Sequence, residues 1–248
     1  MRDCKQAATS CSAMHLVIFD IDGTLTDTTR IDEAGFEQTL AEEFGLHDVS
    51  SDWSIYRHCV DSWIVSEVFQ QRSGRPATIA ELERFQQRFV RVLEAAYVRD
   101  ATLFRPIVGA PELLAHLRGD PTWAVALATG GFRATAEFKL RRAGLSVDDV
   151  AAAFADDGVM REQIVRTALR RALDDYGVRH FERVVAVGDG RGDVHAARNL
   201  HLGFVGRGTG TGAERLRQAG AQHVLPDYAD LSYTVETLRR CATPGPAR

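Results

Sequence analysis

The sequence predicts an α/β fold in which a Rossmann-like core with a parallel sheet carries an inserted α-helical cap. Short apolar runs alternate with segments of helical periodicity, which is typical of a parallel sheet with crossover helices. Roughly ninety residues separate the first two runs, far more than a crossover connection needs, so this stretch is expected to have structure of its own. Polar residues follow directly after three of the runs.

The first predicted strand, 15–19, has the sequence HLVIF and leads into DIDGT at 20–24. In an extended chain, side chains two residues apart share a face, so Asp20 and Asp22 can converge on one small site. Repulsion opposes ionising both, and a divalent cation such as Mg²⁺, which prefers oxygen ligands, resolves the conflict. The alternative is an acidic turn in which Asp22 and Gly23 only bend the chain.

The long connection after this strand has three apolar stripes at helical spacing. The third stripe begins after Thr78 and Glu81, which match a capping box. We therefore predict a helical cap over 28–103, with the catalytic core formed by 14–27 and 104–240. The stripes themselves are typical of core packing, and their residues are Phe36, Leu40 and Phe44; Trp63, Ile64, Val65, Val68 and Phe69; and Leu82, Phe85, Phe89, Val92, Leu93 and Ala96.

The second predicted strand, 123–128, ends in Thr129-Gly130-Gly131 and enters a helix beginning near Phe132. A hydroxyl, small glycines and the first N–H groups of a helix together suit a bound phosphate. The alternative is an ordinary turn between a strand and a helix.

Further strands are predicted at 151–154, 184–187 and 202–205. The strand at 184–187 is followed by Asp189, with Asp193 four residues later. If Asp193 opens a helix, both carboxylates can face a metal pocket, because ligands of parallel sheets bind beyond the carboxyl ends of the strands. Asp193 is equally suited to cap that helix, a role that is compatible with metal support.

These three motifs, in this order and spacing, make the chain resemble the haloacid dehalogenase superfamily. Within it, the resemblance is to the phosphatase branch of phosphoglycolate phosphatases and β-phosphoglucomutase-like proteins with a helical cap. It implies an aspartyl-phosphate mechanism in which Asp20 is the nucleophile and Asp22 the general acid and base. Mg²⁺ is then held by Asp20, the backbone carbonyl of Asp22 and Asp189, with Asp193 assisting, while Thr129 and Gly130 belong to the phosphate-binding group.

One departure from the family concerns the lysine that normally holds the nucleophile and the phosphoryl group. The chain has only Lys5, in the polar N-terminal segment, and Lys139, which is interpreted as a solvated charge on a helix. Arg161 is the predicted substitute, because it begins a helical segment and arginine binds phosphate bidentately without losing its charge. The alternative is an arginine on the helix surface.

Substrate choice is expected to come from cap residues that reach toward the site. A dense polar and aromatic cluster lies in a predicted segment between two cap helices, and packing within the cap is the alternative role for each member. The cluster consists of Trp53, Tyr56, Arg57, His58 and Asp61.

Composition restricts the functions open to the chain. Its 248 residues are 45% hydrophobic and 26% charged with a net charge of −4, which fits a globular enzyme and argues against nucleic acid as a partner. The four cysteines form no Cys-x-x-Cys pair, so structural zinc is not expected. No apolar run reaches membrane-spanning length and no signal-peptide core precedes the first strand, so no membrane association and a cytoplasmic location are predicted. Disordered tails are predicted at 1–13 and 241–248.

The predicted function is Mg²⁺-dependent hydrolysis of a small phosphorylated metabolite, a phosphate monoester. Three alternatives stay open: a phosphosugar mutase or phosphotransferase, a haloacid-type dehalogenase, and a non-catalytic phosphate-binding regulator. The sequence indicates neither the metabolite nor the oligomeric state.

Overall fold

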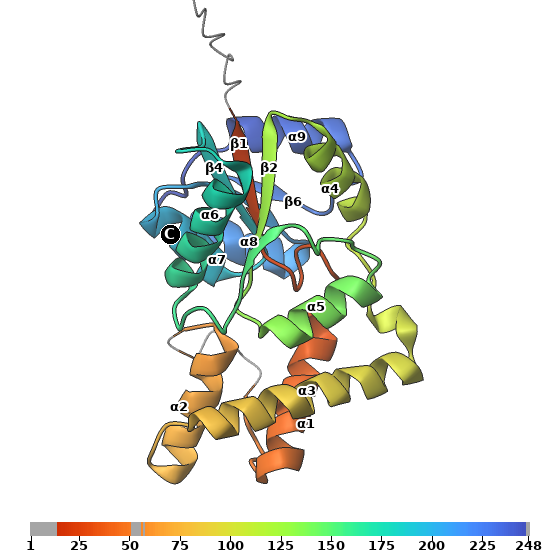
Figure 1. The fold of residues 1–248 in the computed structure, drawn as a ribbon, viewed down its shortest axis with the longest axis vertical. Helices are drawn as coiled ribbons and strands as arrows, with labels where there is room; N and C mark the ends of the chain where they lie inside the picture. The colour runs from red at the N-terminus through yellow and green to blue at the C-terminus, as the bar shows by residue number, and fades with distance from the viewer. Residues whose placement is uncertain (1–13, 51–55, 57, 247–248) are drawn as a thin grey trace, which may run out of the picture.

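The computed structural model describes residues 14–50, 56 and 58–246 of the chain. Strands and helices alternate through most of this part, as Figure 1 shows. The strands are β1 (His15–Phe19), β2 (Trp123–Ala128), β3 (Ala151–Ala153), β4 (Arg183–Gly188), β5 (Gly203–Arg207) and β6 (His223–Leu225). The helices are α1 (Thr29–Phe44), α2 (Asp61–Ser73), α3 (Ile79–Arg99), the 3₁₀ helix η2 (Ala101–Leu103), α4 (Ala110–Gly119), α5 (Arg133–Arg142), α6 (Arg161–Tyr176), α7 (Arg191–Asn199), α8 (Gly210–Gln218) and α9 (Leu231–Arg240).

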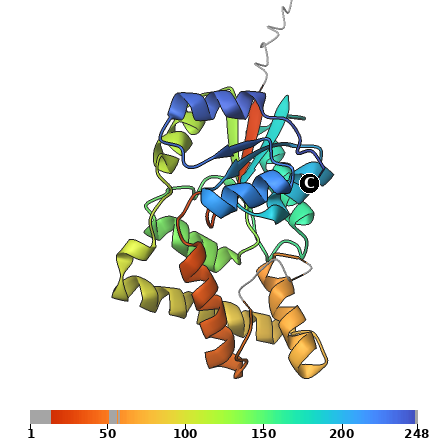
Figure 2. The same ribbon diagram turned by 180° about the vertical axis from the view of Figure 1, so that it is seen from behind.

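The strands form one parallel sheet in the order β3-β2-β1-β4-β5-β6. The first strand of the chain therefore lies inside the sheet, and its Ile18 is level with Ala126 of β2 and Ala186 of β4. Because the strands are parallel, their carboxyl ends meet at one edge of the sheet. This edge faces the layer of α1, α2 and α3 in both ribbon views (Figures 1 and 2).

Both faces of the sheet are covered, which explains why its strands are continuous apolar runs. All six residues of β2 are buried. In β1, Leu16 and Ile18 belong to the apolar core shared with α6 and α7, whereas Val17 and Phe19 belong to the core shared with α4, α5 and α9. The predicted α/β fold with a Rossmann-like parallel sheet is confirmed.

The helices between β1 and β2 pack against each other through aromatic side chains. Phe36 of α1 lies 4.7 Å from Phe85 and 5.8 Å from Phe89 of α3, measured between ring centroids. At the start of α3, the Thr78 hydroxyl accepts from the Glu81 N–H and the Glu81 carboxylate accepts from the Thr78 N–H, so the predicted capping box is present. The expected limits of the cap, 28–103, stay a prediction.

The predicted strands agree with the structure to within two residues at each end. The structure adds β6, which the sequence did not predict because only two of its three residues, His223–Leu225, are apolar. The weakest run, predicted over 151–154, forms the short edge strand β3.

The segment after α9 packs on the core, so a disordered tail starting at residue 241 is not what the described residues show. Cys241 is fully buried, the Phe204 N–H donates to the Ala242 carbonyl at 3.1 Å, and the Gly245 N–H donates to the Gly220 carbonyl at 3.0 Å. These backbone bonds hold 241–246 against β5 and the end of α8.

Among the residues that the structure describes, no helix combines the length and the apolar character that crossing a membrane requires.

Candidate active site

The candidate site lies where β1, β2 and β4 end. Asp20 comes directly after β1, Thr129 directly after β2 and Asp189 directly after β4. These strands are neighbours in the sheet, so the three residues meet at one edge of it. Thr129 and Asp189 are each more than a hundred residues from Asp20 along the chain.

A tight turn after β1 sets the direction of the two aspartates. The N–H groups of Thr24, Leu25 and Thr26 all donate to the carbonyl of Ile21, and Gly23 adopts a left-handed φ of 71°. A Cβ at Gly23 would overlap the carboxylate of Asp189, so only glycine fits here. The acidic turn considered from the sequence is therefore present, and Asp20 also belongs to a cluster of acids with Asp189 and Asp193.

Asp20 is almost fully buried at the centre of the site. One of its carboxylate oxygens accepts from the guanidinium of Arg161, and the other accepts from the Thr24 hydroxyl at 3.2 Å. Burial raises the pKa of Asp20 to about 6, because this effect and the nearby carboxylates outweigh the opposing effect of Arg161.

Three carboxylates form a cluster that fits a hard divalent cation. Asp20, Asp189 and Asp193 each offer one oxygen, and these oxygens lie within 4.8 Å of one another. Burial raises the pKa of Asp189 well above its ordinary value, and the neighbouring acids raise it further. No hydrogen bond or ion pair reaches Asp189 from the described residues, so its negative charge lacks the compensation that a bound cation supplies.

Asp193 belongs both to the first turn of α7 and to the cluster of acids. It lies at the third position of the helix, and its carboxylate accepts from the Gly190 N–H at 3.0 Å. Its other oxygen accepts from Nε of Arg161 at 2.8 Å. Capping and a place beside the metal cluster are thus both present, as the sequence allowed.

Arg161 is the first residue of α6 and lies between two of the acids. Its guanidinium donates to Asp20 and forms an ion pair with Asp193 at 2.6 Å, and its side chain is 13% exposed. Burial lowers the pKa of Arg161, but the two carboxylates raise it by more, so the group stays charged. The structure thus places Arg161 against the predicted nucleophile instead of on the surface.

Lys139 lies elsewhere than the sequence indicated, and the prediction of a solvated surface charge is wrong. Its side chain is 0% exposed, and Nζ donates to Asp22 at 2.6 Å and to Asp32 of α1. The helical pattern of α5 shows which face is apolar, but it does not show that acids from β1 and α1 approach that face. Lysine is rare in this chain, since only Lys5 and Lys139 occur among 30 Lys and Arg residues. This rarity was the available signal that Lys139 has a specific role.

The loop after β2 is held against the start of α2. The Thr129 hydroxyl accepts from the Gly131 N–H at 3.2 Å, while the Gly130 carbonyl accepts from the Asp61 N–H at 2.8 Å. A Cβ at Gly130 would overlap the carbonyl oxygen of Cys59, so the two backbones meet at a distance that only glycine allows.

Asp61 is the member of the predicted specificity cluster that contacts this loop. It is buried, and its carboxylate accepts from the Phe132 N–H at 3.1 Å. Burial raises the pKa of Asp61 well above its ordinary value, and the carboxylate of Asp32 raises it further.

The other members of that cluster contact residues of the segment between β1 and β2 or lie outside the described residues. Tyr56 is buried and donates to the Ser50 carbonyl at 3.0 Å. His58 packs edge-on against Trp63, with ring centroids 4.8 Å apart. Trp53 and Arg57 fall in the part of the chain that the structure does not describe.

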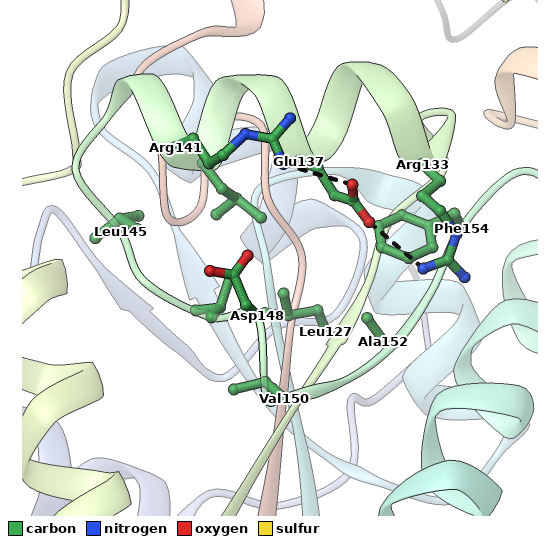
Figure 3. Close-up of a pocket in the computed structure, with 11 residues that line it drawn as sticks. Leu127, Arg133, Glu137, Arg141, Leu145, Asp148, Val150, Ala152 and Phe154 are labelled. Atoms are coloured by element: carbon green, nitrogen blue, oxygen red, sulfur yellow. Dashed lines mark ion pairs between the residues drawn. The ribbon is translucent and has the colours of Figure 1, made fainter.

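A cavity of about 120 Å³ lies apart from the acid cluster, between α5 and the edge strand β3. In Figure 3, Arg133 and Arg141 both turn toward Glu137, at 3.5 Å and 3.6 Å, over an apolar floor. Both arginines are thus already paired with Glu137, and none of the acids of the candidate site lines the cavity.

A parallel sheet with clustered acids and a buried arginine at its strand ends defines an α/β enzyme with an acidic, cation-compatible active site. The model of the haloacid dehalogenase-like hydrolase family matches residues 14–201, which is most of the chain. The chain belongs to this family, and the predicted membership is confirmed.

Solved structures with the same fold have low sequence identity to this chain. A hydrolase from Pseudomonas syringae is 23% identical with a TM-score of 0.67, over 91% of this chain and 99% of that one. CbbY from Rhodobacter sphaeroides, in complex with xylulose-(1,5)bisphosphate, is 19% identical with a TM-score of 0.64, over 88% and 96%. A predicted phosphoglycolate phosphatase from Haemophilus somnus is 16% identical with a TM-score of 0.59, over 90% and 98%. No curated protein matched the chain.

Proposed function

We propose that this hydrolase is a Mg²⁺-dependent phosphatase that cleaves a small phosphorylated metabolite through an aspartyl-phosphate intermediate. The observation that carries the proposal is the arrangement around Asp20. A buried carboxylate at the end of β1 lies beside Arg161 and two further acids, with Asp22 two residues on. A nucleophile, a cation site and a proton carrier are thereby combined at one strand end.

In the proposed first step, an oxygen of Asp20 attacks phosphorus, and Asp22 gives its proton to the leaving oxygen. In the second step, the Asp22 carboxylate takes a proton from water, and that water attacks the phosphorus of the aspartyl-phosphate. The P–O bond to Asp20 breaks, which restores the Asp20 carboxylate and releases inorganic phosphate. Arg161, Thr129 and the Gly130 amide stabilise the phosphoryl oxygens during both steps.

The metal would be held by Asp20, Asp189 and the Asp22 carbonyl with Asp193 beside them, and it would offset negative charge as the phosphoryl group transfers. The fit rests on the acid cluster and on Asp189, which has no donor among the described residues.

A small substrate is supported by the helices over the strand ends. Asp61 and Cys59 lie directly against Gly130, so the inserted helices cover the loop that would bind phosphate. Such a cover excludes bulk water and obstructs a folded phosphoprotein. The named neighbours that bind a sugar bisphosphate or are described as a phosphoglycolate phosphatase favour the same substrate class.

A phosphate-release screen over phosphorylated metabolites, with and without Mg²⁺, tests the proposal. We expect Mg²⁺-dependent release by the wild type and none by Asp20→Asn, which removes the nucleophile at almost no change in size. Asp27→Asn, on the exposed side of the same loop, is the matched control and should keep wild-type activity. Full activity of Asp20→Asn would eliminate the covalent mechanism.

A further inference from the structure

Lys139 is a buried cation that the proposed chemistry has not used. It lies in the middle of α5, is fully enclosed, and binds two carboxylates that come from different parts of the chain. Its partner Asp22 follows β1, and its partner Asp32 belongs to the first inserted helix, α1. One ammonium group therefore connects the core, the inserted helices and the acid next to the nucleophile.

The carboxylate of Asp22 is held from two sides. Lys139 donates to Oδ2 at 2.6 Å, and the Thr28 hydroxyl donates to Oδ1 at 2.6 Å. Thr28 stands at the N-cap position of α1, yet it makes no capping bond from its side chain. A residue that is well suited to capping thus uses its hydroxyl for Asp22 instead.

Stability alone does not account for this arrangement. Desolvating an ammonium group and two carboxylates costs several kcal/mol per ion, and their attraction rarely returns more than that cost. Apolar side chains of similar size at positions 139 and 32 would fill the same space without this buried ion pair. The ion pairs are better explained by what they do to Asp22.

We propose that Lys139 is a positioning residue for proton transfer by Asp22, and that Asp32 holds Lys139 in place. When the P–O bond to the leaving group breaks, the leaving oxygen takes the proton of Asp22, and Asp22 becomes a carboxylate. The observed contacts are those of this carboxylate, which Lys139 and Thr28 fix in the orientation from which it next accepts a proton from water. This inference rests on the proposed phosphatase function.

Aryl phosphates of graded leaving-group strength separate a role in proton transfer from a general role in binding. The expulsion of 2,4-dinitrophenolate needs no proton, whereas phenolate expulsion does. Single-turnover phosphorylation of the protein with Mg²⁺ should therefore be compared for phenyl, 4-nitrophenyl and 2,4-dinitrophenyl phosphate. The rates are measured by rapid quench for the wild type and for Lys139→Met, which keeps an unbranched chain and removes the charge.

We expect Lys139→Met to phosphorylate about 10²-fold more slowly than the wild type with phenyl phosphate and within about threefold of it with 2,4-dinitrophenyl phosphate. Asp32→Asn should show the same dependence on the leaving group, with smaller decreases in rate. If circular dichroism shows that Lys139→Met is not folded, Asp32→Asn provides the test. Arg141→Met removes an exposed cation from the same helix and should leave all three rates unchanged.

An equal loss with all three esters, or no loss, would overturn the role of Lys139 while leaving the phosphatase function intact. Failure of the proposed function is a separate result, in which the wild type itself forms no phosphoenzyme with any of the esters and Mg²⁺. In that case the inference about Lys139 falls as well.

Discussion

At the scale of residues, the two cations of the candidate site are positioned to contact different acids. Arg161 is placed by the start of α6 so that its guanidinium reaches both Asp20 and Asp193. Lys139, on another helix, reaches Asp22. One cation therefore lies at the proposed nucleophile and the other at the proposed proton carrier.

Loss of the cation at the nucleophile should reduce catalysis strongly. We expect Arg161→Ala to lower kcat/KM by about 10²- to 10³-fold, since a charged donor to the transferring phosphoryl group is removed. Arg161→Lys should recover part of this loss by keeping the charge without the fork of donors. Arg166→Ala, an exposed position on the same helix, should match the wild type in the same steady-state assay.

Mg²⁺ affinity should depend on pH through Asp20. Its pKa is raised to about 6, so the carboxyl keeps its proton to a higher pH than an ordinary aspartate, and the proton competes with the metal. The Kd for Mg²⁺ should therefore rise as the pH falls, by about fivefold between about pH 6 and about pH 5 from the titration of Asp20. Calorimetric titrations across this range, together with Asp20→Asn as a variant without the titrating group, check this. A constant Kd would contradict it.

At the scale of elements, α5 is the helix on which the inserted helices rest. The N–H of Phe132, just before α5, donates to the Asp61 carboxylate of α2, and Lys139 forms an ion pair with Asp32 of α1. The ring of Phe138 lies 6.3 Å from the ring of Tyr97 of α3, measured between centroids. α5 is also part of the core beneath the sheet. Each inserted helix therefore has a polar or aromatic contact with one core helix.

The contact between the start of α2 and the loop after β2 should require glycine at position 130. We expect Gly130→Ala to weaken the bond from the Asp61 N–H to the carbonyl at position 130, because the new Cβ would overlap backbone atoms of Cys59. Hydrogen exchange in peptides covering 58–65 should become about tenfold faster or more.

The neighbouring glycine supplies the control for this experiment. A Cβ at Gly131 would meet its neighbours only at ordinary contact distances of 3.6 Å and more, so Gly131→Ala should leave exchange in 58–65 unchanged. Equal exchange in Gly130→Ala and the wild type would show that the close approach does not hold α2 in place.

At the scale of the whole molecule, the end of the chain contributes to the core. Cys241 is fully buried, and 242–246 add backbone hydrogen bonds to β5 and to the end of α8. Burial also raises the pKa of the Cys241 thiol to about 11. The Cys241 thiol therefore stays neutral and packs in the core of the folded protein.

Truncation should reveal this contribution. A chain ending at Arg240 loses the buried thiol and three backbone hydrogen bonds, so its free energy of unfolding should fall by about 2–4 kcal/mol. A chain ending at Pro246 keeps these contacts and should unfold like the full chain. Urea denaturation followed by circular dichroism compares the three proteins, and equal midpoints would show that the end of the chain adds nothing.

The sequence predicts the sheet well and the site in part. The buried parallel strands are continuous apolar runs, and this explains why five of them could be located, while β6 is too short to show a pattern. Asp20, Asp189, Asp193 and Arg161 could be proposed because they follow strands or begin helices. Lys139 could not, since its partners come from segments about a hundred residues away and helical periodicity does not indicate which segments meet.

The central position of β1 has a consequence for biosynthesis. His15–Phe19 is translated before its two neighbours in the sheet, β2 and β4, which lie about 110 and about 170 residues further along. A nascent polypeptide therefore leaves the ribosome with β1 unpaired until β2 has been translated, and with one partner missing until β4 follows. Chain fragments released before Gly188 lack one partner of that strand, so premature termination yields an aggregation-prone product without catalytic capacity.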